Sequence, residues 1–179
     1  MSYCDYCRDH PEDVWHVPYH DQLYGFPIET DAGLFERLVL EINQAGLSWL
    51  TILKKAESFR RAYSGFDLDV VAAYGEADRQ RLLADTGIIR NRLKVEAAIE
   101  NARRLVAIRS SHGSFSAWLA AHHPLTKDQW TKLFQKNFKF TGGEIVNEFL
   151  MSTGWLPGAH DETCPVYTQV LSLQPPWRR

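Results

Sequence analysis

The chain has 179 residues, of which 45% are apolar and 23% are charged, and its formal net charge is −2. This composition is typical of an ordinary globular domain with its own core, and no apolar run approaches the roughly 18–20 residues that span a bilayer, so we expect no membrane partner. The slightly negative charge excludes a protein that binds nucleic acid as a polycation over its whole surface, so any such binding requires a local group of basic residues.

Most of the chain has the residue spacing of helices. Residues 1–30 are the exception, because prolines and glycine interrupt any period there, and they predict an extended N-terminal arm. Apolar residues at helical spacing then predict helices over about 33–44, 49–63, 68–74, 76–85, 91–109 and 144–153, with two more after the capping residues Ser114 and Thr126. The tail from residue 155 has no regular pattern. No stretch alternates apolar and polar residues for long enough to be a strand, so we predict an all-α fold in which residues 1–179 form a single domain.

The longest expected helix follows a tight turn at Gly87. Arg92 and Lys94 lie on its polar faces, as in an amphipathic surface helix. Two helices joined by such a turn, here about 76–109, expose backbone N–H groups at the start of the second helix, and these form a site for a DNA phosphate. Arg90, Arg92 and Lys94 would add positive charge without sequence selectivity. The same pattern also fits a purely structural turn.

Four side chains of the kind that bind metals occur in two pairs, one near each end of the chain. Cys4 and His20 form the first pair, and His160 and Cys164 the second. Two Cys and two His make a closed tetrahedral zinc site, which is structural rather than catalytic, and it would join the two ends. Cys7 leaves the ligand set open, because Cys4-x-x-Cys7 is also a zinc spacing. The odd number of cysteines favours a reducing compartment, and we expect the cytoplasm.

Glu41 lies on the apolar face of its predicted helix, where an unpaired carboxylate is costly. It is either a structural carboxylate paired with a cation, or a group that faces a ligand in a dry pocket. Tyr19, Tyr24 and Trp49 are near it in the sequence. Each of these aromatic residues alone fits a core position. Together with Glu41 they favour a pocket that stacks a planar, positively charged heterocycle.

Longer motifs resemble one known family along nearly the whole chain. The most specific are Gln44-Ala45-Gly46-Leu47-Ser48-Trp49 and Gly87-Ile88-Ile89-Arg90, and the others are Tyr19-His20-Asp21, Tyr24-Gly25, Leu34-Phe35-Glu36, Leu40-Glu41, Asn91-Arg92, Asn101-Ala102-Arg103, Phe138-Lys139-Phe140 with Gly142, and His160-x-x-x-Cys164. On these motifs the chain resembles the 3-methyladenine DNA glycosylase I family, of the helix-hairpin-helix glycosylase type. The resemblance implies an all-α fold with a helix-hairpin-helix element and a structural Zn²⁺ whose ligands are Cys4, His20, His160 and Cys164 rather than Cys7.

The resemblance also implies a base-excision repair enzyme that acts on alkylated double-stranded DNA. Its reaction is hydrolysis of the N-glycosidic bond of 3-methyladenine, which releases the free base and leaves an abasic site. Because adenine methylated at N3 is cationic in DNA and its glycosidic bond is already weak, such an enzyme mainly extrudes the nucleotide, stacks the base and holds it against a carboxylate. The base pocket of the family maps onto Tyr19, Glu41 and Trp49, with Glu41 as the catalytic carboxylate.

Two turns are implied to contact DNA. The first would fill the gap left by the extruded base, and the second would hold phosphates. The residues concerned are Gln44, Gly46 and Leu47 in the first turn and Gly87, Ile89, Arg90 and Arg92 in the second. Nothing in the sequence requires more than a monomer.

The sequence departs from the pattern of the family at several positions. Tyr6 and Tyr24 stand where the family commonly has tryptophan, which keeps an aromatic face but shrinks it and adds a hydroxyl, and we expect both in the base pocket. Residues 126–137, Asn147 and Glu148 also depart from it. Two alternatives follow: a glycosylase for another damaged base, or a non-catalytic DNA- or nucleobase-binding module on the same fold. Retention of the implied base pocket argues against the second.

Overall fold

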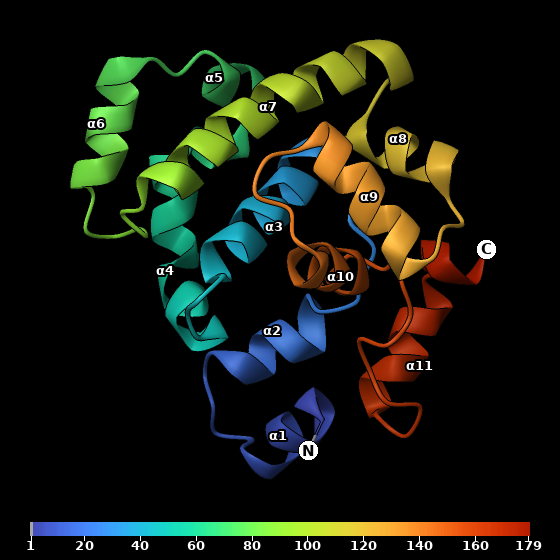
Figure 1. Ribbon diagram of the computed structural model, residues 1–179. Coiled ribbons are helices and arrows are strands. Elements are labelled where there is room, and N and C mark those ends of the chain that lie inside the picture. Colours follow the sequence, from blue (N-terminus) through green and yellow to red (C-terminus); the bar gives the residue numbers. More distant parts are fainter. Residues whose placement is uncertain (1) are drawn as a thin grey trace.

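The computed structural model describes residues 2–179 as helices joined by short connections (Figure 1). No strand occurs among these residues, which confirms the all-α prediction. No helix in this part of the chain has both the length and the apolar character needed to cross a membrane. The elements are α1 (Tyr3–Asp9), α2 (His16–Gln22), α3 (Asp31–Gln44), α4 (Trp49–Ala62), η1 (Ser64–Phe66), α5 (Leu68–Ala72), α6 (Glu76–Ala84), α7 (Arg92–His112), α8 (Phe115–His122), α9 (Lys127–Asn137), α10 (Gly143–Ser152), α11 (Pro165–Ser172) and η2 (Pro176–Arg178).

Side-chain caps fix where the central helices begin. The predicted caps Ser114 and Thr126 both accept hydrogen bonds from backbone N–H groups in the first turns of α8 and α9. Thr30 does the same for α3, and Ser48 for α4. Each cap satisfies a donor that the helix itself leaves free. The predicted helices therefore exist, with ends within a few residues of the expected positions.

The prediction of an extended N-terminal arm is wrong, because residues 3–9 and 16–22 form α1 and α2. The start of α1 is a capping box, in which Ser2 and Asp5 each accept a hydrogen bond from the backbone N–H of the other. Pro18 is the third residue of α2. A proline there removes an N–H that has no partner within the helix, so it does not interrupt α2.

The prediction that the tail from residue 155 has no regular structure is also wrong, because Pro165–Ser172 form α11. Pro165 is the first residue of α11 and follows directly after Cys164. A proline at this position is pre-set for a helix start. The short length of α11 hides its period from sequence analysis, because eight residues make little more than two turns.

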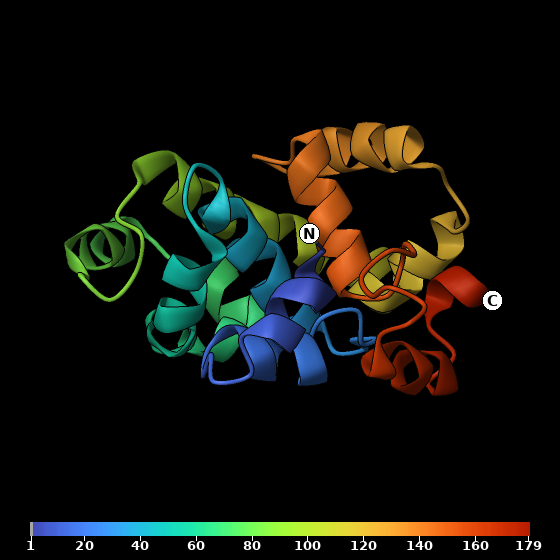
Figure 2. The ribbon, with the colours of Figure 1, turned by 90° about the horizontal axis from the view of Figure 1, so that it is seen from below.

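The helix α3 is the centre of the molecule and packs against α4, α7, α8 and α10. Its side chains Leu34, Phe35 and Leu38 are fully buried. The first two helices pack on each other at one side of this core, and Figures 1 and 2 both show them beside the segment that leads into α11. The N-terminal helices and the segment of residues 160–164, far apart in the sequence, are thus neighbours in space.

Candidate functional site

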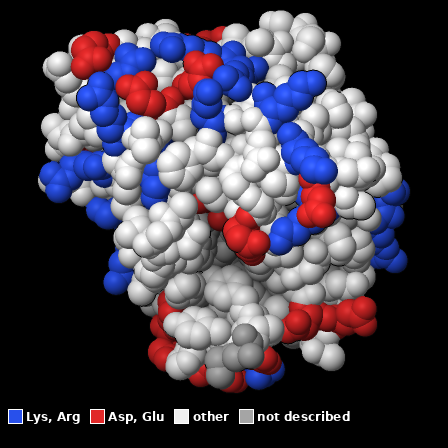
Figure 3. All heavy atoms as spheres, in the orientation of Figure 1, with Lys and Arg blue, Asp and Glu red and all other residues white. Residues whose placement is uncertain are grey.

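A cavity of about 530 Å³ lies between α2, α3, the start of α4 and α10. Figure 3 shows a hollow in the middle of this face of the molecule, with acidic side chains at its edge. Its lining residues are Tyr3, His16, Tyr19, Tyr24, Glu41, Gln44, Trp49, Glu144 and Glu148. The three side chains predicted to make the base pocket, together with Tyr24, therefore line one cavity.

The carboxylate of Glu41 is buried and unpaired. Only 5% of the residue is exposed, and it forms no hydrogen bond or ion pair within residues 2–179. Arg37, one turn earlier on α3, donates to the carbonyl of Ser152 at 3.1 Å and lies over the ring of Tyr19. Burial raises the pKa of Glu41 to about 8, with an opposing effect of Arg37 and a smaller increase from Glu148. A buried carboxylate left unpaired toward a cavity is suited to a cationic ligand.

Aromatic rings form the wall beside Glu41. The ring centroids of Tyr19 and Trp49 are 5.1 Å apart, and those of Tyr19 and Tyr24 are 5.6 Å apart. Tyr3 meets Tyr24 edge-on at 5.3 Å. The indole N–H of Trp49 is buried and has no hydrogen-bond partner in the described chain. This wall offers ring faces to a flat ligand.

The structure places Tyr6 outside this group of rings. Its hydroxyl donates to Asp13 at 2.8 Å, and its ring contacts His16 at 5.2 Å. His16 lines the cavity and Tyr6 does not, so Tyr6 lies one residue behind the wall. The sequence pattern does not place Tyr3 and His16 in the site, because it predicts an extended arm for their segment. Once α2 is known to be a helix, the spacing of three between His16 and Tyr19 puts both on one face.

The turn between α3 and α4 lies next to the cavity and is exposed at its tip. Gln44 lines the cavity, and its amide nitrogen donates to the carbonyl of Leu47 at 2.7 Å. Gly46 has a φ of +82°, a conformation that favours glycine, and no other residue comes within 4 Å of a side chain built there. Leu47 is 38% exposed. The turn thus presents an exposed apolar side chain beside the cavity.

The predicted position of Lys94 on a polar face of α7 is wrong, because the residue is buried. Its ammonium group donates to the carbonyls of Asn43 and Ala45 at 2.8 and 2.7 Å. These carbonyls belong to the end of α3, where the helix leaves them without internal partners. Lys94 therefore ties α7 to the turn between α3 and α4 and adds no charge to the surface.

The turn between α6 and α7 leaves donors free. The N–H of Gly87 donates to the carboxylate of Asp85 at 2.7 Å, whereas the N–H groups of Ile89 and Arg90 donate to no group in residues 2–179. Arg90 and Arg92 are exposed and form no ion pair in that range. A side chain at Gly87 would come within 3.0 Å of Ser58 on α4. The turn thus presents N–H groups and two free guanidinium groups, while glycine allows it to pack on α4.

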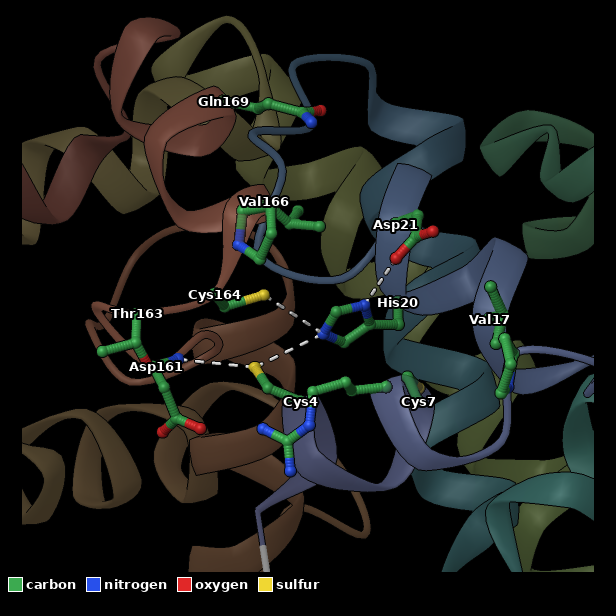
Figure 4. Close-up of a pocket in the computed structure, with 13 residues that line it drawn as sticks. Cys4, Cys7, Val17, His20, Asp21, Asp161, Thr163, Cys164, Val166 and Gln169 are labelled. Carbon is green, nitrogen blue, oxygen red and sulfur yellow. Dashed lines mark hydrogen bonds and ion pairs between the residues drawn. The ribbon is translucent and has the colours of Figure 1, made fainter.

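A cluster of two Cys and two His lies on the other side of α2, as predicted. The ligand atoms of Cys4, His20, His160 and Cys164 lie within 4.8 Å of one another, and all four residues are buried. His20 Nε2 is 3.3 Å from Cys4 Sγ and 3.8 Å from Cys164 Sγ (Figure 4). It is also 3.2 Å from His160 Nδ1. Cys7 is not part of the cluster, although it lines a cavity together with Cys4, His20 and Cys164.

This cluster passes two tests of fit to a metal ion. A tetrahedral Zn²⁺ would hold two histidine nitrogens about 3.3 Å apart and a nitrogen and a sulfur about 3.5 Å apart, given its usual bond lengths, and the cluster is close to both. The outer nitrogens of the rings are also engaged: His20 Nδ1 with Asp21 at 2.7 Å and His160 Nε2 with the carbonyl of Tyr24 at 2.7 Å. Such outer partners fix the tautomer that turns a lone pair toward the metal.

Comparison with known proteins gives consistent results. The family described as methyladenine glycosylase matches residues 10–133. The chain is 35% identical over 175 residues to DNA-3-methyladenine glycosylase 1 of Escherichia coli (strain K12), covering 87% of this chain and 93% of that protein. It is 33% identical to DNA-3-methyladenine glycosylase of Haemophilus influenzae, with 88% and 95% covered. One similar solved structure is that of 3-methyladenine DNA glycosylase I from Staphylococcus aureus, which describes the structural basis of 3-methyladenine recognition. Its TM-score is 0.81 at 31% identity, and the match covers 92% of this chain and 97% of that one.

Proposed function

The chain belongs to the methyladenine glycosylase family, and we propose that it is a DNA-3-methyladenine glycosylase of base-excision repair. The observation that carries this proposal is Glu41, a buried carboxylate with no protein partner in the described chain, at a cavity walled by Tyr19, Tyr24 and Trp49. An extruded, cationic 3-methyladenine would supply the missing partner. Double-stranded alkylated DNA would be the substrate, and the cytoplasm is the compartment we expect.

The cavity would act mainly by holding the extruded nucleotide. Stacking on the aromatic wall and the charge of Glu41 offset the cost of taking the base out of the duplex. In the reaction the N-glycosidic bond breaks and its electron pair goes to the base, which leaves neutral. Water adds to the sugar carbon and loses a proton, which leaves an abasic site. Glu41 contacts the base in this scheme, so we assign it the catalytic role.

Two turns would hold the DNA. Leu47, on the exposed turn after α3, would fill the space of the extruded base, with Gln44 and Gly46 shaping that turn. The second turn, between α6 and α7, would serve as a helix-hairpin-helix element and bind phosphate through the free N–H groups of Ile89 and Arg90. Both turns belong to one chain, so one copy would make both contacts, and we propose that the protein acts as a monomer.

We also propose that the Cys₂His₂ cluster holds a structural Zn²⁺. Its four protein ligands would close the coordination sphere, so the ion would have no open position for chemistry. The consecutive residues Tyr19 and His20 show what it would do: His20 is in the cluster and Tyr19 lines the cavity. Fixing α2 at His20 would therefore hold the aromatic wall in place.

The test of the main proposal is release of free base from methylated DNA. The purified protein should liberate 3-methyladenine, detected by chromatography, and leave alkali-sensitive abasic sites in equal number. The same DNA without methylation is the control. Release of a different damaged base would support the altered-specificity alternative, for which Tyr24 is the structural reason, because it is the one replaced tryptophan that lines the cavity. Binding of methylated DNA without any release would support the non-catalytic alternative.

A further inference from the structure

The base cavity contains a second partly buried carboxylate that the proposed reaction does not use. Glu148 lies on α10, whereas Glu41 lies on α3, so the two acids reach one cavity from different helices. The hydroxyl of Tyr24 donates to Glu148 Oε2 at 3.4 Å. Glu148 is one of the positions at which the sequence departs from the pattern of the family. Its place in the cavity gives that departure a physical meaning.

Glu148 differs from the third acidic residue of the lining, Glu144. Glu144 is one turn earlier on α10, with its side chain 87% exposed, and it pairs with Lys127 at 3.1 Å. Glu148 is half-buried and has no basic partner within residues 2–179. Burial raises the pKa of Glu148, while the hydrogen bond from Tyr24 acts in the opposite direction. Glu144 is thus a solvated residue at the rim of the cavity, and Glu148 is a half-buried carboxylate with a long hydrogen bond from a tyrosine.

The carboxylates are the charged side chains of the cavity lining, and His16 is a further titratable group there, while Arg37 and Lys127 act on the two inner carboxylates from outside the lining. No lysine or arginine is among its lining residues, and Glu41 has no partner there. Two carboxylates that share a cavity repel each other when both are ionised. A cationic ligand removes that repulsion and pairs with both, whereas a neutral ligand of the same shape does neither. A cavity of this kind selects for charge as well as for shape.

We propose that Glu148, with the hydroxyl of Tyr24 beside it, is a second base-binding carboxylate that makes the site selective for cationic N-alkylated purines over neutral purines. The inference rests on the proposed function, since it assumes that the cavity takes an extruded base. Glu41 supplies the deeper contact, and Glu148 and Tyr24 together form the polar side of the pocket. Glu148 is a specificity-determining residue in this scheme.

The test uses two free bases that differ in charge. The probes are 3,9-dimethyladeninium, which is cationic at neutral pH, and 9-methyladenine, which is neutral, and binding is measured by calorimetry or by tryptophan fluorescence. Glu148→Gln keeps the size and removes the charge. Because Glu148 is only half-buried, we expect it to weaken binding of the cation by roughly 3- to 30-fold and to change binding of the neutral base by less than about twofold. Glu57→Gln, the same change at an exposed position of α4, should alter neither.

Each outcome decides the inference. Weaker binding of the cation alone supports it, whereas equal loss for both bases, or no loss for either, overturns it. Melting temperatures show whether the variants are folded. If Glu148→Gln does not fold, Glu148→Asp keeps the charge on a shorter side chain, and it should retain a preference for the cation. Loss of that preference in a folded Glu148→Asp protein would contradict the inference.

The same proteins separate this inference from the proposed function. Base binding needs no turnover. A native protein that releases no 3-methyladenine but binds the cation through Glu148 would therefore contradict the proposed function and support the inference. A native protein that releases 3-methyladenine, with cation binding that is unaffected by Glu148→Gln, would do the reverse.

Discussion

Glu41 is the residue at which stability and function are most directly opposed. Its pKa is about 8 in the folded protein, against an ordinary value of 4.5, because burial disfavours the charged form. The folded state therefore holds the proton more tightly than the unfolded state between these two values. The contribution of Glu41 to stability is most favourable below pH 4.5 and is lost as the pH rises to about 8. The free energy cost of ionising the buried Glu41 remains until a cation binds beside it.

The first prediction concerns stability. Glu41→Gln should stabilise the protein above pH 8 by on the order of 2–4 kcal/mol, because it removes an unpaired buried charge. Its free energy of unfolding should also lose the decline that the native protein shows between about pH 4.5 and 8. Denaturant unfolding at several pH values measures both effects. If Glu41 were instead one half of a structural ion pair, the variant would be less stable by a few kcal/mol, as expected when a cation loses its partner.

The second prediction concerns activity of the same variant. Removing a charged hydrogen bond to the ligand should lower kcat/KM for 3-methyladenine release about 10- to 150-fold. In the native protein kcat/KM should rise with pH as Glu41 ionises and level off above about 8, since this ratio reports the free enzyme. The residual activity of Glu41→Gln should lack that rise. Normal activity per folded molecule would place Glu41 outside the site.

At the scale of elements, Lys94 shows how α7 and the turn after α3 depend on each other. Lys94→Met keeps most of the length and apolar stem but removes hydrogen bonds to the carbonyls of Asn43 and Ala45. The loss should lower the free energy of unfolding by about 1–3 kcal/mol, because two carbonyls at the end of α3 lose their partner. Arg92→Met, an exposed change on the same turn of α7, should stay within about 0.5 kcal/mol of the native protein. Equal stability of the two variants would show that the hydrogen bonds of Lys94 contribute nothing.

The turn between α6 and α7 leads to a prediction about DNA. Arg90 is exposed and unpaired in the described chain, next to two free N–H groups. Arg90→Ala should reduce the slope of log affinity against log salt concentration by about 1, and weaken binding to methylated and unmethylated duplexes alike. Lys136→Ala on α9 carries the same change in charge and should leave that slope unchanged. A slope unaffected by Arg90→Ala would remove this turn from the phosphate contacts.

The sequence predicts elements well where local signals agree and poorly where a long-range contact decides. Capping residues such as Ser114 and Thr126 lie beside the helices they start, so those helices could be predicted. The role of Lys94 could not, because its acceptors are about 50 residues away and its own helix gives a lysine no reason to be buried. In the site, the helical spacing places Glu41 on the apolar face of its helix, so the sequence alone identifies it as unusual. No spacing reveals that Glu148 joins it, because that depends on how α10 packs against α3.

At the scale of the whole molecule, the proposed metal ion would help to keep the short terminal helices ordered. α1 and α2 have seven residues each, and α11 has eight, which is too short for any of them to be stable alone. Beyond their packing, the cluster brings together the side chains Cys4, His20, His160 and Cys164 from both ends of the chain. An ion there would close a loop that contains nearly all of the core. The terminal helices and Tyr19 of the aromatic wall would then share one anchor.

The last prediction tests that anchor. Elemental analysis should find one Zn²⁺ per chain, and a strong chelator should lower the melting temperature, since the binding free energy of a structural metal is also folding free energy. Cys164→Ser should abolish the metal content, whereas Cys7→Ser should keep it, because Cys7 lies outside the cluster although it has the spacing of a zinc ligand. Loss of metal in Cys7→Ser, or a native protein with ordered ends and no metal, would contradict the assignment. Chelation should also weaken binding of the cationic base, because Tyr19 is on the same helix as His20 and would lose its fixed position when His20 is released from the metal. If chelation lowered the melting temperature but left base binding unchanged, the ion would only join the terminal segments. The packing of α2 on its neighbours would then be enough to position the aromatic wall.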